Sequence, residues 1–316
     1  MGKKFGIRMN SIILMMILLL GAFIVVVPST AIAPQVGDYT YTLSGSPAVA
    51  IITGYTGNGG AITIPSNLGG NTVVAIGENA FDNYNGHLVT SVIIPSSVAV
   101  IEGFAFFYCR ALTSVTIGSG VNSIGSFTFG SCASLTHVDI PDSVTTIGGA
   151  AFIYCTNLTS VTIGSGVYLI DSSAFSECWS LTHVEIPDSV TTIGDNAFLD
   201  CFSLTSVTIG SGVTAIGASA FRDCTSLTSI TFLGLTAPII VGNYWIDNTD
   251  WAIMGHAYAD SNFPATGEAW NGLTMGDVLP EPVSPSSDGT MLYLAIGIAA
   301  VVVVIAVIVV LMRKKK

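Results

Sequence analysis

The sequence predicts a solenoid, a stack of short repeats whose β-strands run parallel to one another. Three observations predict it: the six cysteines of the chain recur every 23 residues, a phenylalanine lies three residues before each of them, and a leucine lies three residues after each. A fixed period of this length is typical of repeat proteins, in which each repeat buries its apolar side chains only against its neighbours. The recurring residues are Cys109, Cys132, Cys155, Cys178, Cys201 and Cys224; Phe106, Phe129, Phe152, Phe175, Phe198 and Phe221; and Leu112, Leu135, Leu158, Leu181, Leu204 and Leu227.

Each 23-residue repeat is predicted to contain one strand and one return segment. Val115 and Ile117 alternate with a polar residue, as in a strand that buries one face, and a glycine or proline then ends the strand in successive repeats. Val121 and Ile124 are spaced too widely for one face of a strand. We therefore expect an irregular or short helical return segment, with Phe129 closing the core.

The repeat also resembles a known family. The pattern x-Ile-Gly-x-x-Ala-Phe-x-x-Cys-x-x-Leu-x-x-Val-x-Ile, seen clearly in residues 144–163, is similar to the leucine-rich repeat of the BspA-like surface proteins of bacteria and archaea. The similarity extends over about residues 50–235. It implies a curved solenoid of parallel strands, and it implies a secreted or anchored protein that adheres to other cells or to a matrix.

The N-terminal residues 1–33 have the layout of a secretory signal. Lys3, Lys4 and Arg8 precede an uncharged run over residues 12–27, and small residues follow. An uncleaved anchor is the alternative, because this run is only slightly shorter than a bilayer span. Residues 34–60, rich in Gly, Thr and Tyr, predict a β-rich N-terminal cap, and residues 61–235 form the predicted solenoid.

Beyond residue 235 the repeat pattern ends. Residues 236–278 contain three of the four tryptophans and predict a C-terminal cap over the open end of the solenoid, and residues 279–290 predict a stiff linker rich in proline and serine. Residues 291–312 carry no charge and are long enough to span a bilayer as a helix. The basic residues 313–316 favour a cytoplasmic C-terminus. We therefore expect a single-pass protein of the plasma membrane whose solenoid faces outward.

Charge narrows the range of partners. All twenty acidic residues lie between Asp38 and Asp288, where Arg110 and Arg222 are the only basic residues, so this region has a net charge of −18. Such a surface repels phosphate groups, which argues against nucleic acid as a partner. Extracellular proteins or carbohydrates are the expected partners, in addition to the membrane.

Two arrangements of the cysteines are compatible with the period. Equivalent residues of neighbouring rungs lie about 4.8 Å apart, farther than the Cβ separation of about 3.8 Å in a disulfide, so a reduced ladder beside the phenylalanines is favoured. The alternative is three disulfides that pair Cys109 with Cys132, Cys155 with Cys178, and Cys201 with Cys224, as export from the cell would favour. The chain has no Cys-x-x-Cys spacing, and we expect neither a metal site nor a cofactor.

A longer period of 46 residues marks the candidate binding residues. In alternate repeats the outward strand positions carry a histidine and an acidic residue in place of serine and threonine. Placing like charges two rungs apart separates them by nearly 10 Å, which reduces their repulsion. We expect these positions on the concave face, as ligand contacts or simply as solvated charge pairs. They are Ser114, Thr116, His137, Asp139, Ser160, Thr162, His183, Glu185, Ser206 and Thr208.

No catalytic constellation stands out from the repeat. The serines recur as members of regular columns, and no pair of carboxylates lies outside the repeat pattern. The sequence therefore predicts a non-enzymatic surface protein for adhesion or recognition. The alternative function is a structural spacer of the cell envelope that has no specific ligand.

Overall fold

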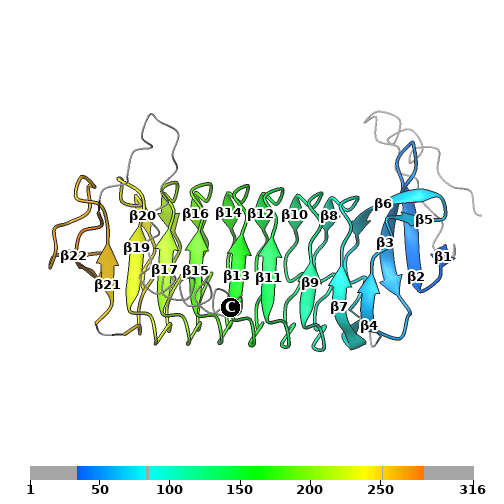
Figure 1. The fold of residues 1–316 in the computed structure, drawn as a ribbon, viewed down its shortest axis with the longest axis horizontal. Helices are drawn as coiled ribbons and strands as arrows, with labels where there is room; N and C mark the ends of the chain where they lie inside the picture. The colour runs from blue at the N-terminus through cyan, green and yellow to red at the C-terminus, as the bar shows by residue number, and fades with distance from the viewer. Residues whose placement is uncertain (1–33, 83–84, 251, 281–316) are drawn as a thin grey trace, which may run out of the picture.

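The protein forms one elongated stack of rungs in a computed structural model that describes residues 34–82, 85–250 and 252–280. Figure 1 shows the N-terminal strands at one end of the stack and the C-terminal strands at the other. Each 23-residue repeat contributes one strand to a front sheet and a shorter strand to a second sheet. The inward side chains of both sheets join one apolar core.

From β7 to β13 and from β15 to β21 the front strands are parallel and in register. At the C-terminal end β22 pairs antiparallel with β23. Val138, for example, is the Cα partner of Val115 on one side and of Val161 on the other. The front sheet is divided into a five-stranded part that ends at β13 and a six-stranded part that begins at β15. Its strands are β4 (Gly60–Thr63), β7 (Val89–Ile93), β9 (Ser114–Thr116), β11 (His137–Ile140) and β13 (Ser160–Ile163), then β15 (His183–Ile186), β17 (Ser206–Ile209), β19 (Ser229–Phe232), β21 (Met254–His256), β23 (Leu273–Met275) and β22 (Ala269–Trp270).

The return segments are irregular, as one of the two expectations had it, except for a two-residue strand in each; the alternative of short helical segments was wrong. Val121 belongs to a turn in which its N–H donates to the Gly118 carbonyl, whereas Ile124 belongs to a two-residue strand. The two residues are thus parts of different elements, which explains their wide spacing. In the described residues the helical structure is one 3-10 turn, η1 (Gly86–Leu88).

These short strands belong to a twelve-stranded second sheet that runs the length of the stack. Antiparallel pairing of β1, β2 and β3 begins it, in the region predicted as the N-terminal cap. Its strands are β1 (Gln35–Val36), β2 (Tyr39–Ser44), β3 (Val49–Tyr55), β5 (Asn67–Leu68), β6 (Asn71–Ile76), β8 (Val100–Ile101), β10 (Ser123–Ile124), β12 (Thr146–Ile147), β14 (Leu169–Ile170), β16 (Thr192–Ile193), β18 (Ala215–Ile216) and β20 (Ile240–Val241).

A stack of phenylalanine rings runs along the core. The rings of Phe152 and Phe175 are parallel within 1°, with centroids 5.2 Å apart, and the same spacing recurs from rung to rung. At the N-terminal end Tyr55 stacks on Phe81, and at the C-terminal end Trp245 lies edge-on against Phe221. Offset rings in contact gain free energy beyond the area they bury, so the aromatic column links successive rungs.

Two kinds of rung alternate along the stack. In proline rungs the front strand is followed by Pro95, Pro141 or Pro187, and in glycine rungs by Gly118, Gly164 or Gly210. A Cβ atom on Gly166 would lie 2.0 Å from the carbonyl oxygen of Asp142. Only glycine therefore lets a glycine rung approach the proline rung before it so closely.

The step from a glycine rung to the next proline rung is looser. Proline has no N–H, so Pro187 cannot donate to the preceding rung. The front sheet is interrupted at this step, between β13 and β15, whereas β9 and β11 stay paired at the equivalent step to Pro141. Where Leu233 takes the place of proline, its N–H donates to the Ile209 carbonyl at 2.9 Å. The exposure of the last strand residue also differs. Ile163, before the rung with Pro187, is 7% exposed, and Ile209, before the rung with Leu233, is only 1% exposed. The 46-residue period thus has a packing origin as well as an electrostatic one.

The predicted signal (residues 1–33), membrane helix (residues 291–312) and basic tail (residues 313–316) lie outside the described residues. The same holds for all but the first two residues of the predicted linker. Within the part of the chain that the structure describes, no helix has the length and apolar character needed to cross a bilayer.

Candidate functional site on the strand face

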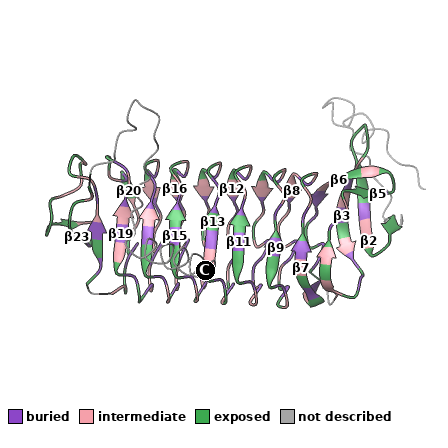
Figure 2. Cartoon of the chain, in the orientation of Figure 1, coloured by how far each residue is buried: buried purple, intermediate pink, exposed green. Residues whose placement is uncertain are grey.

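The outward side of the front strands, which we call the strand face, carries all ten predicted binding residues. Parallel pairing places them in two columns, because His137 is the Cα partner of both Ser114 and Ser160, and His183 is the partner of Ser206. Figure 2 shows exposed residues alternating with buried ones along β11 and β15. The columns are thus built by the two-residue period of the strands and the in-register stacking of the rungs.

In the first 46-residue unit the polar residues satisfy one another. Nε2 of His137 donates to Asp139 Oδ1 at 2.9 Å, and Nδ1 lies 2.8 Å from Ser160 Oγ. A hydrogen bond from the Thr162 hydroxyl, together with the nearby His137, holds the pKa of Asp139 below its usual value. This unit is a closed polar network.

Ser160, His137 and Asp139 thus stand in the order of a nucleophilic triad, an arrangement that the sequence did not suggest. The side chains of His137 and Asp139 are 48% and 73% exposed, so water solvates both groups. Acyl transfer at such a triad depends on donors aimed at the developing oxyanion in a site that excludes water. The exposed side chains of this network lack that exclusion.

The second unit differs from the first. Nδ1 of His183 lies 3.2 Å from Thr182 Oγ1, and His183 makes no contact with Glu185 of the kind that joins His137 to Asp139. Glu185 is exposed, and its carboxylate has no hydrogen-bond or ion-pair partner among the described residues. The second unit therefore presents a free carboxylate where the first presents a paired one.

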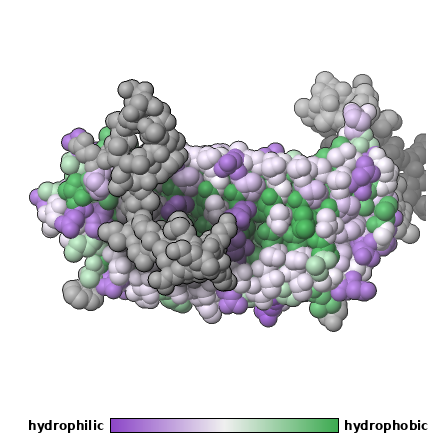
Figure 3. Space-filling view, viewed as in Figure 1, coloured by the Kyte–Doolittle hydropathy of each residue, from purple (hydrophilic) through white to green (hydrophobic). Residues whose placement is uncertain are grey.

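A hollow of about 420 Å³, which we call the seam hollow, lies at the interruption between β13 and β15. Its lining includes apolar side chains that are buried or half-buried and polar ones that reach the surface. On this side of the molecule, Figure 3 shows apolar surface between polar regions. The residues that define the seam hollow are Ile163, Pro187, Leu233, Glu185, Asp188 and Thr208.

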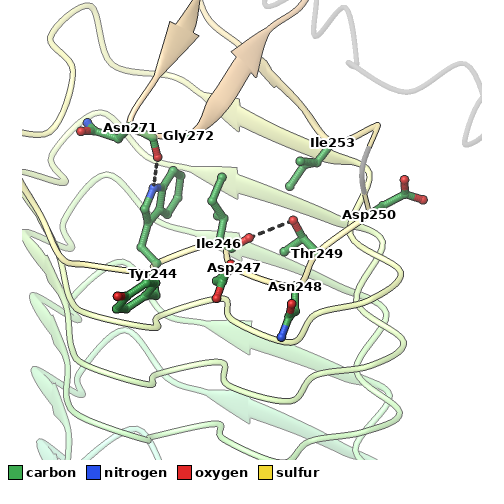
Figure 4. Close-up of a pocket in the computed structure, with 10 residues that line it drawn as sticks. Tyr244, Ile246, Asp247, Asn248, Thr249, Asp250, Ile253, Asn271 and Gly272 are labelled. Carbon is green, nitrogen blue, oxygen red and sulfur yellow. Dashed lines mark hydrogen bonds between the residues drawn. The ribbon is translucent and has the colours of Figure 1, made fainter.

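A second hollow, of about 330 Å³, lies in the region predicted as the C-terminal cap (Figure 4). Trp245 closes one side by donating from Nε1 to the Asn271 carbonyl at 2.8 Å. The polar side chains of this segment do not point toward a common site. Asn248 donates to Asp223, and Asp250 accepts from a backbone N–H of its own loop. Among the described residues, no three His, Cys, Asp or Glu side chains are grouped so as to hold a metal ion.

The structure adds two sets of polar residues that the sequence did not single out. Asp142 of a proline rung accepts from both the N–H and the hydroxyl of Ser165 in the next glycine rung, and these bonds lower the pKa of its carboxyl. Asp188 binds Ser211 in the same way.

The second set is a threonine that recurs every 23 residues at the start of the front strand. Its hydroxyl donates to the backbone carbonyl of the equivalent threonine in the preceding rung. These threonines are Thr113, Thr136, Thr159, Thr182, Thr205 and Thr228. Their 23-residue spacing was the available signal.

All six cysteines are free and buried. Each Sγ donates to the carbonyl of the phenylalanine one rung back, at 3.1 to 3.8 Å. Burial raises the pKa of Cys109 and of Cys155 to about 12. The thiols are thus part of the core hydrogen bonding, on the side of the stack where the phenylalanine rings lie.

Comparison with known proteins identifies the repeat. A model of the BspA type leucine rich repeat region, in six copies, matches residues 74–202 and 145–244, which together cover more than half of the chain. No curated protein matches the chain.

Solved structures resemble the chain as well. A leucine-rich repeat protein of T. pallidum is 29% identical over 67% of this chain and 86% of its own, with a TM-score of 0.51. A leucine-rich cell surface protein of Faecalibacterium prausnitzii A2-165 is 28% identical over 71% of this chain and 76% of its own, with a TM-score of 0.47. The first of these two structures supports the assignment of the fold.

Proposed function

Because the chain belongs to the BspA type leucine-rich repeat family, we propose that it recognises extracellular proteins or glycans at the cell surface through its strand face. One observation carries the proposal. Ten polar side chains stand in two in-register columns, and each lies exposed or half-buried on the outward side of its strand. Residues with this placement contribute little to the core and are available to a partner.

The same proposal includes the location of the protein. Residues 1–33 direct export, and residues 291–312 hold the chain in the plasma membrane, with the acidic solenoid outside and the basic tail inside. The alternating pattern of apolar and charged segments supports this orientation. The solenoid acts as a binding scaffold without catalysis, in keeping with the leucine-rich repeat proteins that it resembles.

The test measures binding of the full-length chain, purified in detergent, to arrays of extracellular proteins and glycans. The strand-face variant combines His137→Ala, Asp139→Ala, His183→Ala and Glu185→Ala. We expect it to lose most of the binding that the unchanged chain shows. The control variant carries Asn122→Ala and Tyr168→Ala, which lie exposed on return segments instead.

Two results would contradict the proposal. Equal binding by the strand-face variant and the unchanged chain would place the recognition surface elsewhere. A chain that binds no member of either array would favour the spacer function.

A further inference from the structure

The seam hollow lies where the front sheet is interrupted, between β13 and β15. Pro187 offers no N–H to the glycine rung before it, and the buried side chain of Ile163 forms part of the lining. The apolar side chains of Pro187 and Leu233 complete this part of the lining. An apolar hollow on a polar surface favours the entry of an apolar group from a partner.

The polar side of the seam hollow is negatively charged. The Glu185 carboxylate has no partner in the part of the chain that the structure describes, and Asp188 accepts two hydrogen bonds from Ser211, which leave its negative charge in place. Arg222, the nearer of the two arginines in sequence, is already paired with Asp223 at 3.2 Å. The negative charges of Glu185 and Asp188 would therefore attract a cation placed beside Glu185, because no arginine in the described residues neutralises them.

Apolar lining beside a free carboxylate is complementary to one kind of side chain. Lysine and arginine carry an aliphatic stem that packs on apolar surface and a cationic head that pairs with a carboxylate. Resting on the proposed recognition function, we propose that the seam hollow receives a lysine or arginine side chain of a partner protein, with Glu185 as its ion-pair partner. The strongly acidic character of the solenoid supports a basic partner.

This inference separates the two 46-residue units, which the sequence presents as equivalent. Asp139 is held by His137 and Thr162, so a partner cation would have to compete with bonds that already exist. Glu185 has no such bonds to lose. The second unit is therefore the one that selects the partner's charge.

The experiment uses the full-length chain and immobilised Gly/Ser peptides that carry a central lysine, arginine or norleucine. Norleucine has an apolar stem similar to that of lysine but lacks the charge. We expect the lysine and arginine peptides to bind more tightly than the norleucine peptide, and Glu185→Gln to weaken them by about fivefold, as for a solvent-accessible ion pair. Added salt should weaken them too, because the pair is partly open to solvent.

Glu78→Gln is the matched control, since it removes the same charge by the same exchange at an exposed position outside the strand face. Thr208→Phe is a second variant, which occupies the hollow without changing the charge. We expect Glu78→Gln to bind the basic peptides as the unchanged chain does and Thr208→Phe to bind them less.

An equal loss in Glu78→Gln and Glu185→Gln would overturn the inference, because it would show general attraction to an acidic surface. Preference for chitosan, a polymer of amino sugars, over the lysine peptide would overturn the assignment to a protein partner. These failures are distinct from failure of the proposed function. If the proteins or glycans found on the arrays bind the Glu185→Gln chain normally but not the strand-face variant, the proposed recognition function holds and the proposed role of the seam hollow is wrong.

Discussion

A cysteine in this solenoid is a hydrogen-bond donor rather than a reactive group. The Cys155 thiol donates to the Phe129 carbonyl at 3.2 Å in a fully buried position, and burial raises its pKa to about 12. A thiolate there would lose its hydration without gaining a cationic partner. Burial in the core therefore keeps this thiol protonated and unreactive.

This has a consequence for stability at high pH. The unfolded thiol ionises near pH 9, while the folded thiol of Cys155 ionises near pH 12, so between these values the unfolded chain binds fewer protons. The free energy of unfolding should then fall as pH rises, by up to about 1.4 kcal/mol per pH unit for each such cysteine. Below pH 9 this stability is fully present.

Denaturant unfolding of the chain and of Cys155→Ala, measured from pH 8 to about pH 11, tests this expectation. The difference in unfolding free energy between the two proteins should shrink as pH rises above about 9. Parallel pH profiles for the two proteins would contradict the assignment of a strongly raised pKa.

At the scale of the element, the turns after the front strands decide how closely two rungs approach. Pro141 and Asp142 form the edge on which Gly164 and Gly166 rest. A proline rung and the glycine rung after it are thus one packed unit. The looser contact falls between units.

Gly166→Ala should be strongly destabilising for this reason. Its Cβ would lie 2.0 Å from a carbonyl oxygen of Asp142, which belongs to the backbone and cannot move aside without displacing the rung. We expect a loss of about 2 kcal/mol or more in the free energy of unfolding. The matched control is Gly149→Ala, whose Cβ would meet its nearest neighbour, the Ser172 carbonyl oxygen, at 3.4 Å. Equal losses in the two variants would show that the close approach is unimportant.

The sequence allowed the parallel front strands, the inward Val and Ile positions and the two polar columns to be predicted, because these depend on a strict period and on strand alternation. It did not reveal the short strands of the return segments, since two residues such as Ser123 and Ile124 are too few to show alternation. The seam hollow was also missed. Its lining comes from several rungs of the stack, a relation that is not visible within one repeat.

At the scale of the whole molecule, stability should be close to a sum of contributions from rungs and from contacts between neighbours. Deleting residues 142–187 removes one 46-residue unit and joins Pro141 to Asp188, so a proline rung is again followed by a glycine rung. Deleting residues 142–164 removes a single rung and places two proline rungs side by side. We expect the longer deletion to leave the more stable protein.

Thermal unfolding of the two deletion variants, followed by circular dichroism, gives the comparison. The unit deletion should retain a single cooperative transition, and the single-rung deletion should melt at a lower temperature. The opposite order would show that the number of rungs outweighs the alternation of proline and glycine.

The side-chain ladders also give the stack a direction. The hydroxyl of Thr136 donates to the carbonyl of Thr113, and the thiol of Cys132 donates to that of Phe106, so both kinds of donor point toward the N-terminus. The ribosome delivers the chain from that end. Each newly made rung therefore meets acceptors that are already in place, and the finished rungs serve as a template for the nascent one.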